Sequence, residues 1–357
     1  MKVTNNLVAR ILRQPHLSVS LGLADWDLLI RQARHADLLA RIGIVLDEQG
    51  LIDRIPAKPR AHLESAGTVV ARHAHAVRWE VQCLRKALAS IGVPVILLKG
   101  AAYLMADLPP ARGRIFSDVD LLVPKDRLNQ VEAALRLHGW SNSHHGAYDQ
   151  RYYRIWMHEL PPMMHLKRQS VLDVHHNILP ESARLHPDPA RLIEAATSVV
   201  NDESVKALAP VDMVLHSATH LFHEGELEHG LRDLADLDSL LRHFSGLPSF
   251  WSALLPRAQE LELTRPLFYA MRYTRLIFDT PLPESLTKTV SGPGWPLITV
   301  MDAIYGRALA PVHPSCSDWL TGIARWMLYV RAHWLRMPTW LLMRHLFQKA
   351  FLSPKQE

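Results

Sequence analysis

The sequence has few cysteines and no long apolar run. Its 357 residues include only two cysteines, Cys83 and Cys316, and no Cys-x-x-Cys pair. A disulfide framework and a cysteine-based zinc or redox motif are therefore excluded. No stretch of about 18 apolar residues occurs, so no membrane span is expected. The first residues also lack the apolar segment and cleavage site of a signal peptide, and we expect a cytoplasmic protein.

The composition is that of a globular protein with a basic balance. Hydrophobic residues make up 48% and charged residues 21% of the chain, which is long enough to bury more than one core. A net charge of +5 favours polyanionic partners: nucleotides, nucleic acid or anionic lipid. The basic residues are dispersed, without the aromatic–basic repeats of single-strand RNA binders. Nucleic acid therefore stays open as an acceptor but is not favoured.

The most informative motif places two carboxylates inside an apolar run. Asp118 and Asp120 lie in the segment Ser-Asp-Val-Asp-Leu-Leu-Val. Residues i and i+2 of a strand point to the same face, so the two side chains would lie side by side. Two neighbouring carboxylates repel each other unless a positive charge compensates them. A divalent cation that also binds substrate phosphates often does so. The alternative is a solvated strand end, and the motif alone does not choose between them.

A candidate phosphate-binding turn precedes this motif. The apolar run Val-Ile-Leu-Leu ends at Lys99 and Gly100 and leads into a helix-like segment. Glycine allows the backbone to approach a ligand closely, and exposed N–H groups at a helix start suit a phosphate. The following loop carries Arg112 and Arg114, which could bind phosphates bidentately. Taken alone, the turn and the loop could equally be solvent-exposed.

A third carboxylate follows on an alternating strand pattern. In the segment Val-Leu-Asp-Val-His-His-Asn-Ile, Asp173 and His175 would share one face, and Leu172, Val174 and His176 the other. A carboxylate on a neighbouring strand could reach the same metal site or act as a base toward a hydroxyl. The turn, the paired carboxylates and the third carboxylate, in this order, indicate a metal and phosphate site more strongly than any one of them does alone.

This order of motifs resembles the nucleotidyltransferase superfamily with the polymerase-β-type palm. More closely, the stretches LLKGAA, SDVDLLV and LDVHHNI resemble the uncharacterised bacterial nucleotidyltransferase-5 group, as does a later helical segment around residues 216–237. The resemblance spans roughly residues 20–280. It implies an α+β fold in which a palm, a mixed β-sheet with helices, lies between N- and C-terminal helical regions. The turn departs from the usual Gly-Gly or Gly-Ser, since Lys99-Gly100-Ala101 stands there.

The resemblance also implies roles for individual residues. Catalysis and Mg²⁺ (or Mn²⁺) binding fall to Asp118, Asp120 and Asp173. His175 is an accessory candidate. An NTP such as ATP would bind through five further residues: Lys99, Gly100, Ala101, Arg114 and Ser117. A hydroxyl acceptor would attack the α-phosphorus, and pyrophosphate would leave.

The acceptor stays open at this point. A saccharide of envelope polysaccharide synthesis, a peptide natural product, a protein or tRNA would all offer a hydroxyl. Two alternatives to this function are a toxin-like nucleotidyltransferase that acts on tRNA or protein, and a catalytically silent nucleotide-binding scaffold. The complete set of three carboxylates argues against the scaffold.

Periodicity and punctuation divide the chain into four regions. We expect a helical region over 1–90, with a helix over 71–88 that ends before Gly92 and Pro94. The palm follows over 91–185, with a helix over 125–137 and strands over 152–157, 163–167 and 171–178. A C-terminal helical domain is expected over 186–315, including helices over 212–224 and 231–241. The last region, 316–357, is a basic, Trp-rich helical tail.

The tail and the histidines each have two interpretations. Trp319, Trp326, Trp334 and Trp340 alternate with arginines, as in helices that lie in a membrane interface; we therefore considered peripheral contact of residues 318–353 with an anionic membrane on its inner face. The favoured alternative is a basic helix packed on the core, with buried tryptophans. Among the 21 histidines, His216 and His220 have the i, i+4 spacing of a zinc-binding helix but lack the glutamate of HExxH, which favours a packing role.

Overall fold

The N-terminal part of the chain is helical. The computed structural model describes residues 6–142, 157–199, 202–225 and 227–337. The first four helices are α1 (Leu7–Arg13), α2 (Leu23–His35), α3 (Leu39–Glu48) and α4 (Ala57–Ala89). The helix expected over 71–88 is the second half of α4, whose alanine-rich sequence continues without a break. Gly92, with φ of +63°, and Pro94 then turn the chain into the sheet.

The middle of the described chain forms a mixed sheet of seven strands. Its spatial order is β3-β4-β5-β2-β1-β7-β6. Strand β2 pairs with β1 antiparallel and with β5 parallel, so it lies near the centre of the sheet. The strands are β1 (Val95–Leu98), β2 (Asp118–Leu122), β3 (Trp140–Asn142), β4 (Met163–His165), β5 (Val171–His175), β6 (Thr197–Val199) and β7 (Asp202–Ala207). Short helices connect them: α5 (Lys99–Met105), α6 (Leu128–Leu137) and α8 (Pro189–Ala195).

The sheet extends further along the chain than the sequence analysis expected. Strands β6 and β7 lie where the sequence predicts helix, and β7 pairs parallel with β1. The other expected strands and helices between 93 and 178 are present with shorter bounds. The expected strand over 152–157 falls almost wholly on residues 143–156, outside the described part. The division of the chain into four domains remains a prediction.

The rest of the described chain is helical. It comprises α9 (Pro210–Thr219), α10 (Gly230–Phe244), α11 (Phe250–Glu260), α12 (Thr264–Phe278), α13 (Glu284–Thr289), α14 (Trp295–Ala308) and α15 (Thr321–Arg336). A single π-helical turn, His220–Glu224, follows α9 and ends at Gly225 in the left-handed region. Such turns are rare and frequent at functional sites.

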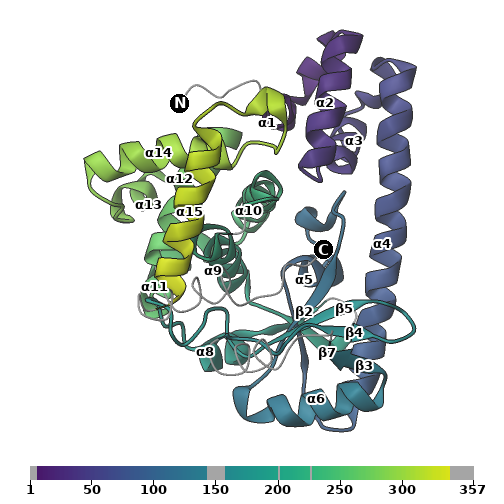
Figure 1. The fold of residues 1–357 in the computed structure, drawn as a ribbon, viewed down its shortest axis with the longest axis vertical. Helices are drawn as coiled ribbons and strands as arrows, with labels where there is room; N and C mark the ends of the chain where they lie inside the picture. Colours follow the sequence, from purple (N-terminus) through teal and green to yellow (C-terminus); the bar gives the residue numbers. More distant parts are fainter. Residues whose placement is uncertain (1–5, 143–156, 200–201, 226, 338–357) are drawn as a thin grey trace, which may run out of the picture.

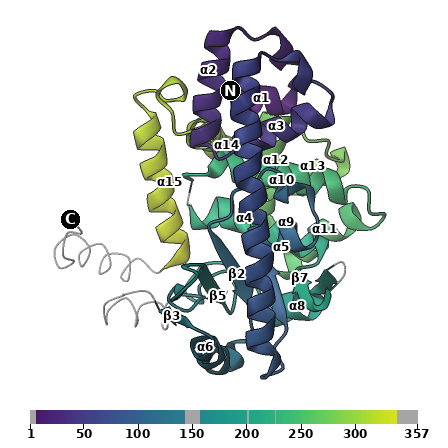
Figure 2. The same cartoon turned by 90° about the vertical axis from the view of Figure 1, so that its right-hand side faces the viewer.

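One continuous hydrophobic core joins all three parts. It runs from Leu7 in α1 through the central strands to Leu328 in α15. In Figure 1 the sheet lies in the lower part, α4 passes along its side over almost the full height, and α9 and α10 lie above it. Figure 2 shows α4 in front of the other layers and α15 along the left side of the view. The fold is therefore α+β, with a mixed sheet between helical regions, as the sequence predicts.

The described tail packs through one face only. In α15 the buried positions include Ala324, Leu328 and Ala332, whereas Trp319, just before the helix, and Trp326 are 82% and 64% exposed. The interpretation with buried tryptophans is therefore wrong for the described part of the tail, and Trp340 lies outside it. Among the helices that the structure describes, none combines the length and the apolarity needed to cross a bilayer.

Candidate active site

Three carboxylates meet on two neighbouring strands. The parallel register of β2 and β5 places Asp120 directly beside Asp173, and Asp118 lies two residues earlier on the same face of β2. Val119, Leu121 and Leu122 fill the core around them, which keeps the strand fixed. Asp120 is only 3% exposed, so the motif is not a solvated strand end.

Two nitrogen groups, from Lys99 and His175, flank Asp120. Lys99 Nζ donates to Asp120 Oδ1 at 3.1 Å, and His175 Nε2 lies 3.0 Å from the same oxygen. Burial alone would raise the pKa of Asp120, but Lys99 and His175 outweigh it and hold this pKa well below its usual range. Asp120 is thus ionised although it is buried.

The other two carboxylates lie in a different electrostatic setting. Burial, reinforced by the charge of Asp120, raises the pKa of Asp118 and raises that of Asp173 to about 7. Ser117 Oγ donates to Asp118 Oδ1 at 2.8 Å and orients it. Asp173 Oδ1 is buried and accepts no hydrogen bond from the residues that the structure describes. A buried acceptor beside two further carboxylates is a donor set that fits a hard divalent cation.

The Lys99–Gly100 turn forms the floor beside Asp120. Helix α5 begins at Lys99, whose φ of +46° is uncommon for a residue with a Cβ. Strain of this kind gathers at functional sites, and here it directs the ammonium group toward Asp120. A Cβ at Gly100 would come within 3.0 Å of Arg114 Nε and the Phe116 ring, so glycine is needed for close packing.

Arg114 is held by an internal charge network. Its guanidinium donates to Asp236 of α10, and Asp236 also accepts from Arg41 Nη2 of α3 at 2.7 Å. Burial lowers the pKa of Arg41 and of Arg114 to about 10 each. The sequence leaves Arg114 as a candidate phosphate ligand or part of an exposed loop; the structure shows that it is largely buried and that part of its donor capacity is used within the protein.

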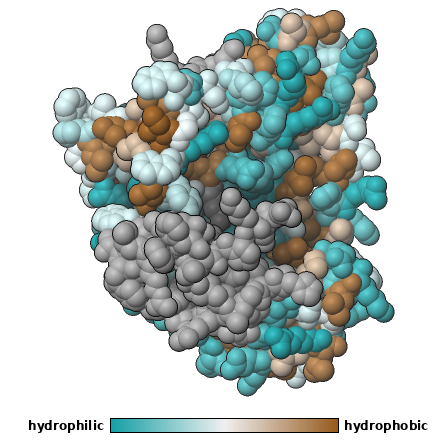
Figure 3. Space-filling view, viewed as in Figure 1, coloured by the Kyte–Doolittle hydropathy of each residue, from teal (hydrophilic) through white to brown (hydrophobic). Residues whose placement is uncertain are grey.

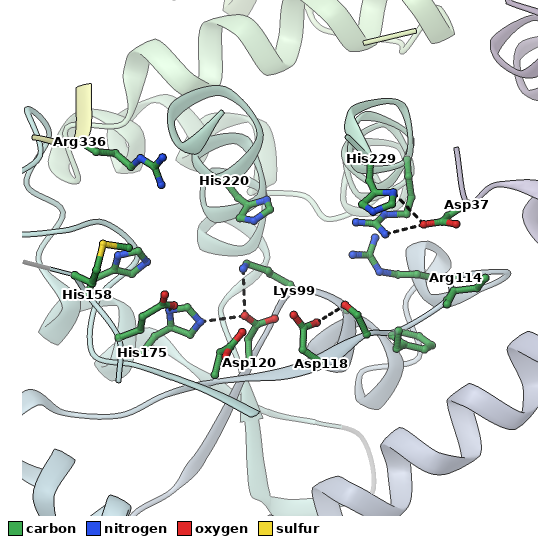
Figure 4. A pocket seen from close by; sticks show the side chains of 18 residues that line it. Asp37, Lys99, Arg114, Asp118, Asp120, His158, His175, His220, His229 and Arg336 are labelled. Carbon is green, nitrogen blue, oxygen red and sulfur yellow. Dashed lines mark hydrogen bonds and ion pairs between the residues drawn. The ribbon is translucent and has the colours of Figure 1, made fainter. Parts of the chain in front are cut away.

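All but one of the sequence-predicted residues line one cleft of about 310 Å³ (Figure 4). Ala101 is the exception, because it is buried and does not reach the cleft. The opposite wall comes from α10 and the turn before α3. There Asp37 lies 3.0 Å from His229 Nδ1 and 3.5 Å from Arg232 Nη1. Figure 4 shows Asp37 and His229 across the cleft from Asp118 and Asp120.

Sequence reasoning missed two further residues beside His175. An isolated antiparallel bridge places Glu159 opposite His175, and Glu159 Oε2 lies 3.2 Å from His175 Nδ1. The buried His158 ring lies 5.3 Å from that of His175. The dipeptide His-Glu before Leu-Pro-Pro is the only local signal, and its pairing with β5 is a tertiary feature. His220 reaches the cleft as well, whereas His216 is buried among the helices.

The fold and the site together define a nucleotide-transferring enzyme of the palm type. A mixed sheet presents paired carboxylates from β2 and a third from β5 beside a Lys-Gly turn. A family model described as uncharacterised nucleotidyltransferase matches residues 23–279. The chain belongs to this family and is a transferase. A comparison with curated proteins gives no match.

Proposed function

We propose that the protein moves a nucleoside monophosphate from a nucleoside triphosphate to a hydroxyl acceptor, with a divalent cation. The observation that carries this proposal is the register of β2 and β5, which sets Asp120 beside Asp173 and turns both, with Asp118, into a cleft with a basic opposite wall. Family membership supports nucleotidyl transfer as the class of reaction. Cation, nucleotide and acceptor are parts of our proposal.

The three carboxylates are the proposed cation ligands. Asp118 and Asp120 hold Mg²⁺ or Mn²⁺, and Asp173 completes the set with its unpaired Oδ1. When bound, the cation supplies positive charge to the phosphates and to the leaving pyrophosphate. It would also relieve the repulsion that raises the pKa of Asp118 and Asp173.

The triphosphate is proposed to lie between the turn and the basic wall. Lys99 and Gly100 line the cleft on the β2 side, while Arg232 stands on the far side with a side chain 14% exposed. Arg114 contributes its remaining donors. Ser117 keeps Asp118 in place by its hydrogen bond. Charge-assisted hydrogen bonds from these groups offset the phosphate charge.

Asp173 is the proposed base. Its pKa is about 7 without the cation, and when one of its oxygens binds the cation the other oxygen is the one proposed to accept the proton. The acceptor hydroxyl gives its proton to Asp173, and its oxygen forms a bond to the α-phosphorus. The bond between the α-phosphorus and its bridging oxygen to the β-phosphate breaks, and pyrophosphate leaves with the electron pair.

A test of the reaction uses two labels. The protein is incubated with Mg²⁺, cell extract and NTPs labelled at either the α- or the γ-phosphate. We expect a macromolecular or lipid fraction to take up α-label but not γ-label, and Asp118→Asn to reduce uptake at least about 100-fold. Asp126→Asn, on the exposed turn before α6, is the matched control.

A second measurement does not need the acceptor. Calorimetry of NTP binding with Mg²⁺ and with EDTA tests the cation and the nucleotide directly. Binding that is absent in both conditions, or equal transfer by wild type and Asp118→Asn, contradicts the proposal.

We also propose peripheral contact with an anionic membrane through α15, which favours an envelope saccharide as acceptor. Support comes from Trp319, Trp326 and Trp334, which are 82%, 64% and 43% exposed. Figure 3 shows apolar and pale patches over the face that carries α14 and α15. Exposed tryptophans beside arginines suit the headgroup region.

A further inference from the structure

The environment of His175 points to a position for a cation on its second nitrogen. The ring lies between two carboxylates, with Nε2 at 3.0 Å from Asp120 and Nδ1 at 3.2 Å from Glu159. A carboxylate oxygen only accepts, so Nε2 carries the hydrogen that is donated to Asp120. In the neutral ring Nδ1 then has a lone pair that faces the lone pairs of Glu159. This contact needs either a second proton or a metal ion between the two atoms.

Backbone pairing holds the contact between Glu159 and His175 in place. Glu159 and His175 are directly opposite in an antiparallel bridge. Hydrogen bonds on both sides fix it, from Leu160 N to Val174 O and from His176 N to His158 O, each at 2.8 Å. Residues opposite each other in such a pair have neighbouring side chains on one face. The two ligand atoms are therefore held in place before any ion binds.

A third ligand completes the cluster. One ring nitrogen of His158, the Glu159 carboxylate and His175 Nδ1 or Nε2 all lie within 4.8 Å of one another. Two ligands at about 2.1 Å from a tetrahedral metal are about 3.4 Å apart, and the separation of 3.2 Å between His175 Nδ1 and Glu159 Oε2 is close to this value. A metal ion would use all three side chains of the cluster, whereas a proton on His175 Nδ1 would use only His175 and Glu159.

We propose that His158, Glu159 and His175 form a second metal site, distinct from the three-carboxylate site, for a cation of the Zn²⁺ class. Two imidazoles and one carboxylate suit borderline metals such as Zn²⁺ and Co²⁺, whereas Mg²⁺ prefers oxygen ligands. Asp120 orients the ligand His175 through Nε2, as an outer carboxylate does in many zinc sites. This inference does not depend on nucleotidyl transfer.

The proposed metal site opens onto the cleft. All three residues line the 310 Å³ cleft, so a metal with three protein ligands keeps at least one position open to it. That position would take a water molecule or an oxygen atom of a substrate. The hydrogen bond to Asp120 couples this second site to the carboxylate site.

The experiment is Co²⁺ titration of the metal-free full-length protein without nucleotide, followed by visible absorption, and Zn²⁺ competition followed by calorimetry. We expect one Co²⁺ with the absorption of a tetrahedral complex, displaced by Zn²⁺ but not by Mg²⁺. Glu159→Gln and His158→Gln should each weaken binding at least about tenfold. The control variants should retain it: Asp118→Asn in the carboxylate site, and His220→Gln, an imidazole elsewhere in the cleft.

These variants distinguish Co²⁺ binding at the two proposed metal sites. Thermal melting checks that each variant folds. Equal Co²⁺ affinity in wild type, Glu159→Gln and His158→Gln overturns the proposal, as does the absence of Co²⁺ binding by wild type. In either case a proton, not a metal, lies between His175 and Glu159. Loss of NTP transfer in the earlier test would leave the Co²⁺ result unchanged, so the two proposals fail independently.

Discussion

Ionisation of the Asp173 carboxylate destabilises the folded, metal-free protein. Its pKa rises from about 4 in an unfolded chain to about 7 in the folded protein without metal, because of burial and then the charge of Asp120. Between these values the folded state binds the extra proton, so stability falls as pH rises from about 4 to 7. Above pH 7 the full cost is present in the metal-free protein.

Asp173→Asn should therefore stabilise the metal-free protein at pH 8, by on the order of 1–3 kcal/mol, and change little at pH 4. Denaturant unfolding in EDTA at both pH values measures this, with Asp126→Asn as a surface control. Adding Mg²⁺ at pH 8 should stabilise wild type more than the variant. If the variant is equally or less stable than wild type at pH 8, ionisation of Asp173 does not destabilise the folded protein.

The local chemistry of the site could be predicted from the sequence, but its contacts could not. The i, i+2 spacing of Asp118 and Asp120 and the alternation around Asp173 indicate strands and faces, because strand geometry fixes them. That β2 and β5 pair in parallel, with Asp120 opposite Asp173, depends on sheet topology. Glu159 was missed for the same reason, since only the bridge to His175 gives it a role.

At the scale of elements, α10 connects the cleft to the N-terminal helices. Asp236 accepts from Arg41 of α3 and from Arg114 of the loop before β2, although 195 residues separate Asp236 from Arg41. The exposed fractions of the Asp236 and Arg41 side chains are 3% and 7%. The periodicity of a helical sequence shows which residues share a face of the helix. It does not show which distant arginine forms an ion pair with a residue on that face.

Asp236→Asn should destabilise the protein by about 3–5 kcal/mol, because two buried guanidinium groups lose their shared carboxylate. It should also weaken NTP binding, because Arg114 is no longer fixed at the cleft. The matched control is Asp53→Asn, which breaks the exposed pair with Arg60 and should change stability by less than about 1 kcal/mol. Unfolding in denaturant and calorimetric NTP titration give the two readouts, and comparable stability of both variants would contradict the network's role.

At the scale of the whole molecule, the cleft needs all three parts of the chain. The N-terminal helices contribute Asp37, the sheet contributes the carboxylates, and α10 contributes Arg232. One continuous core connects these parts, so their relative positions are fixed by packing. The family match over residues 23–279 covers all of these site residues but ends before α14 and α15. Helix α15 contributes Arg336 to the cleft, but the exposed tryptophans Trp319, Trp326 and Trp334 are not among the residues that line it.

This separation allows the membrane proposal to be tested without damage to the cleft. We expect Trp319→Ser with Trp326→Ser to reduce sedimentation with anionic vesicles several-fold, because both rings are exposed and their removal leaves the buried face of α15 intact. Trp79→Ser, on α4 and 58% exposed, is the matched control and should sediment like wild type. Neutral vesicles and high salt should weaken sedimentation of wild type, since the net charge of +5 supplies attraction to anionic lipid. If wild type stays in the supernatant, or if the double variant sediments as well as wild type does, α15 makes no membrane contact and its tryptophans no longer favour an envelope acceptor.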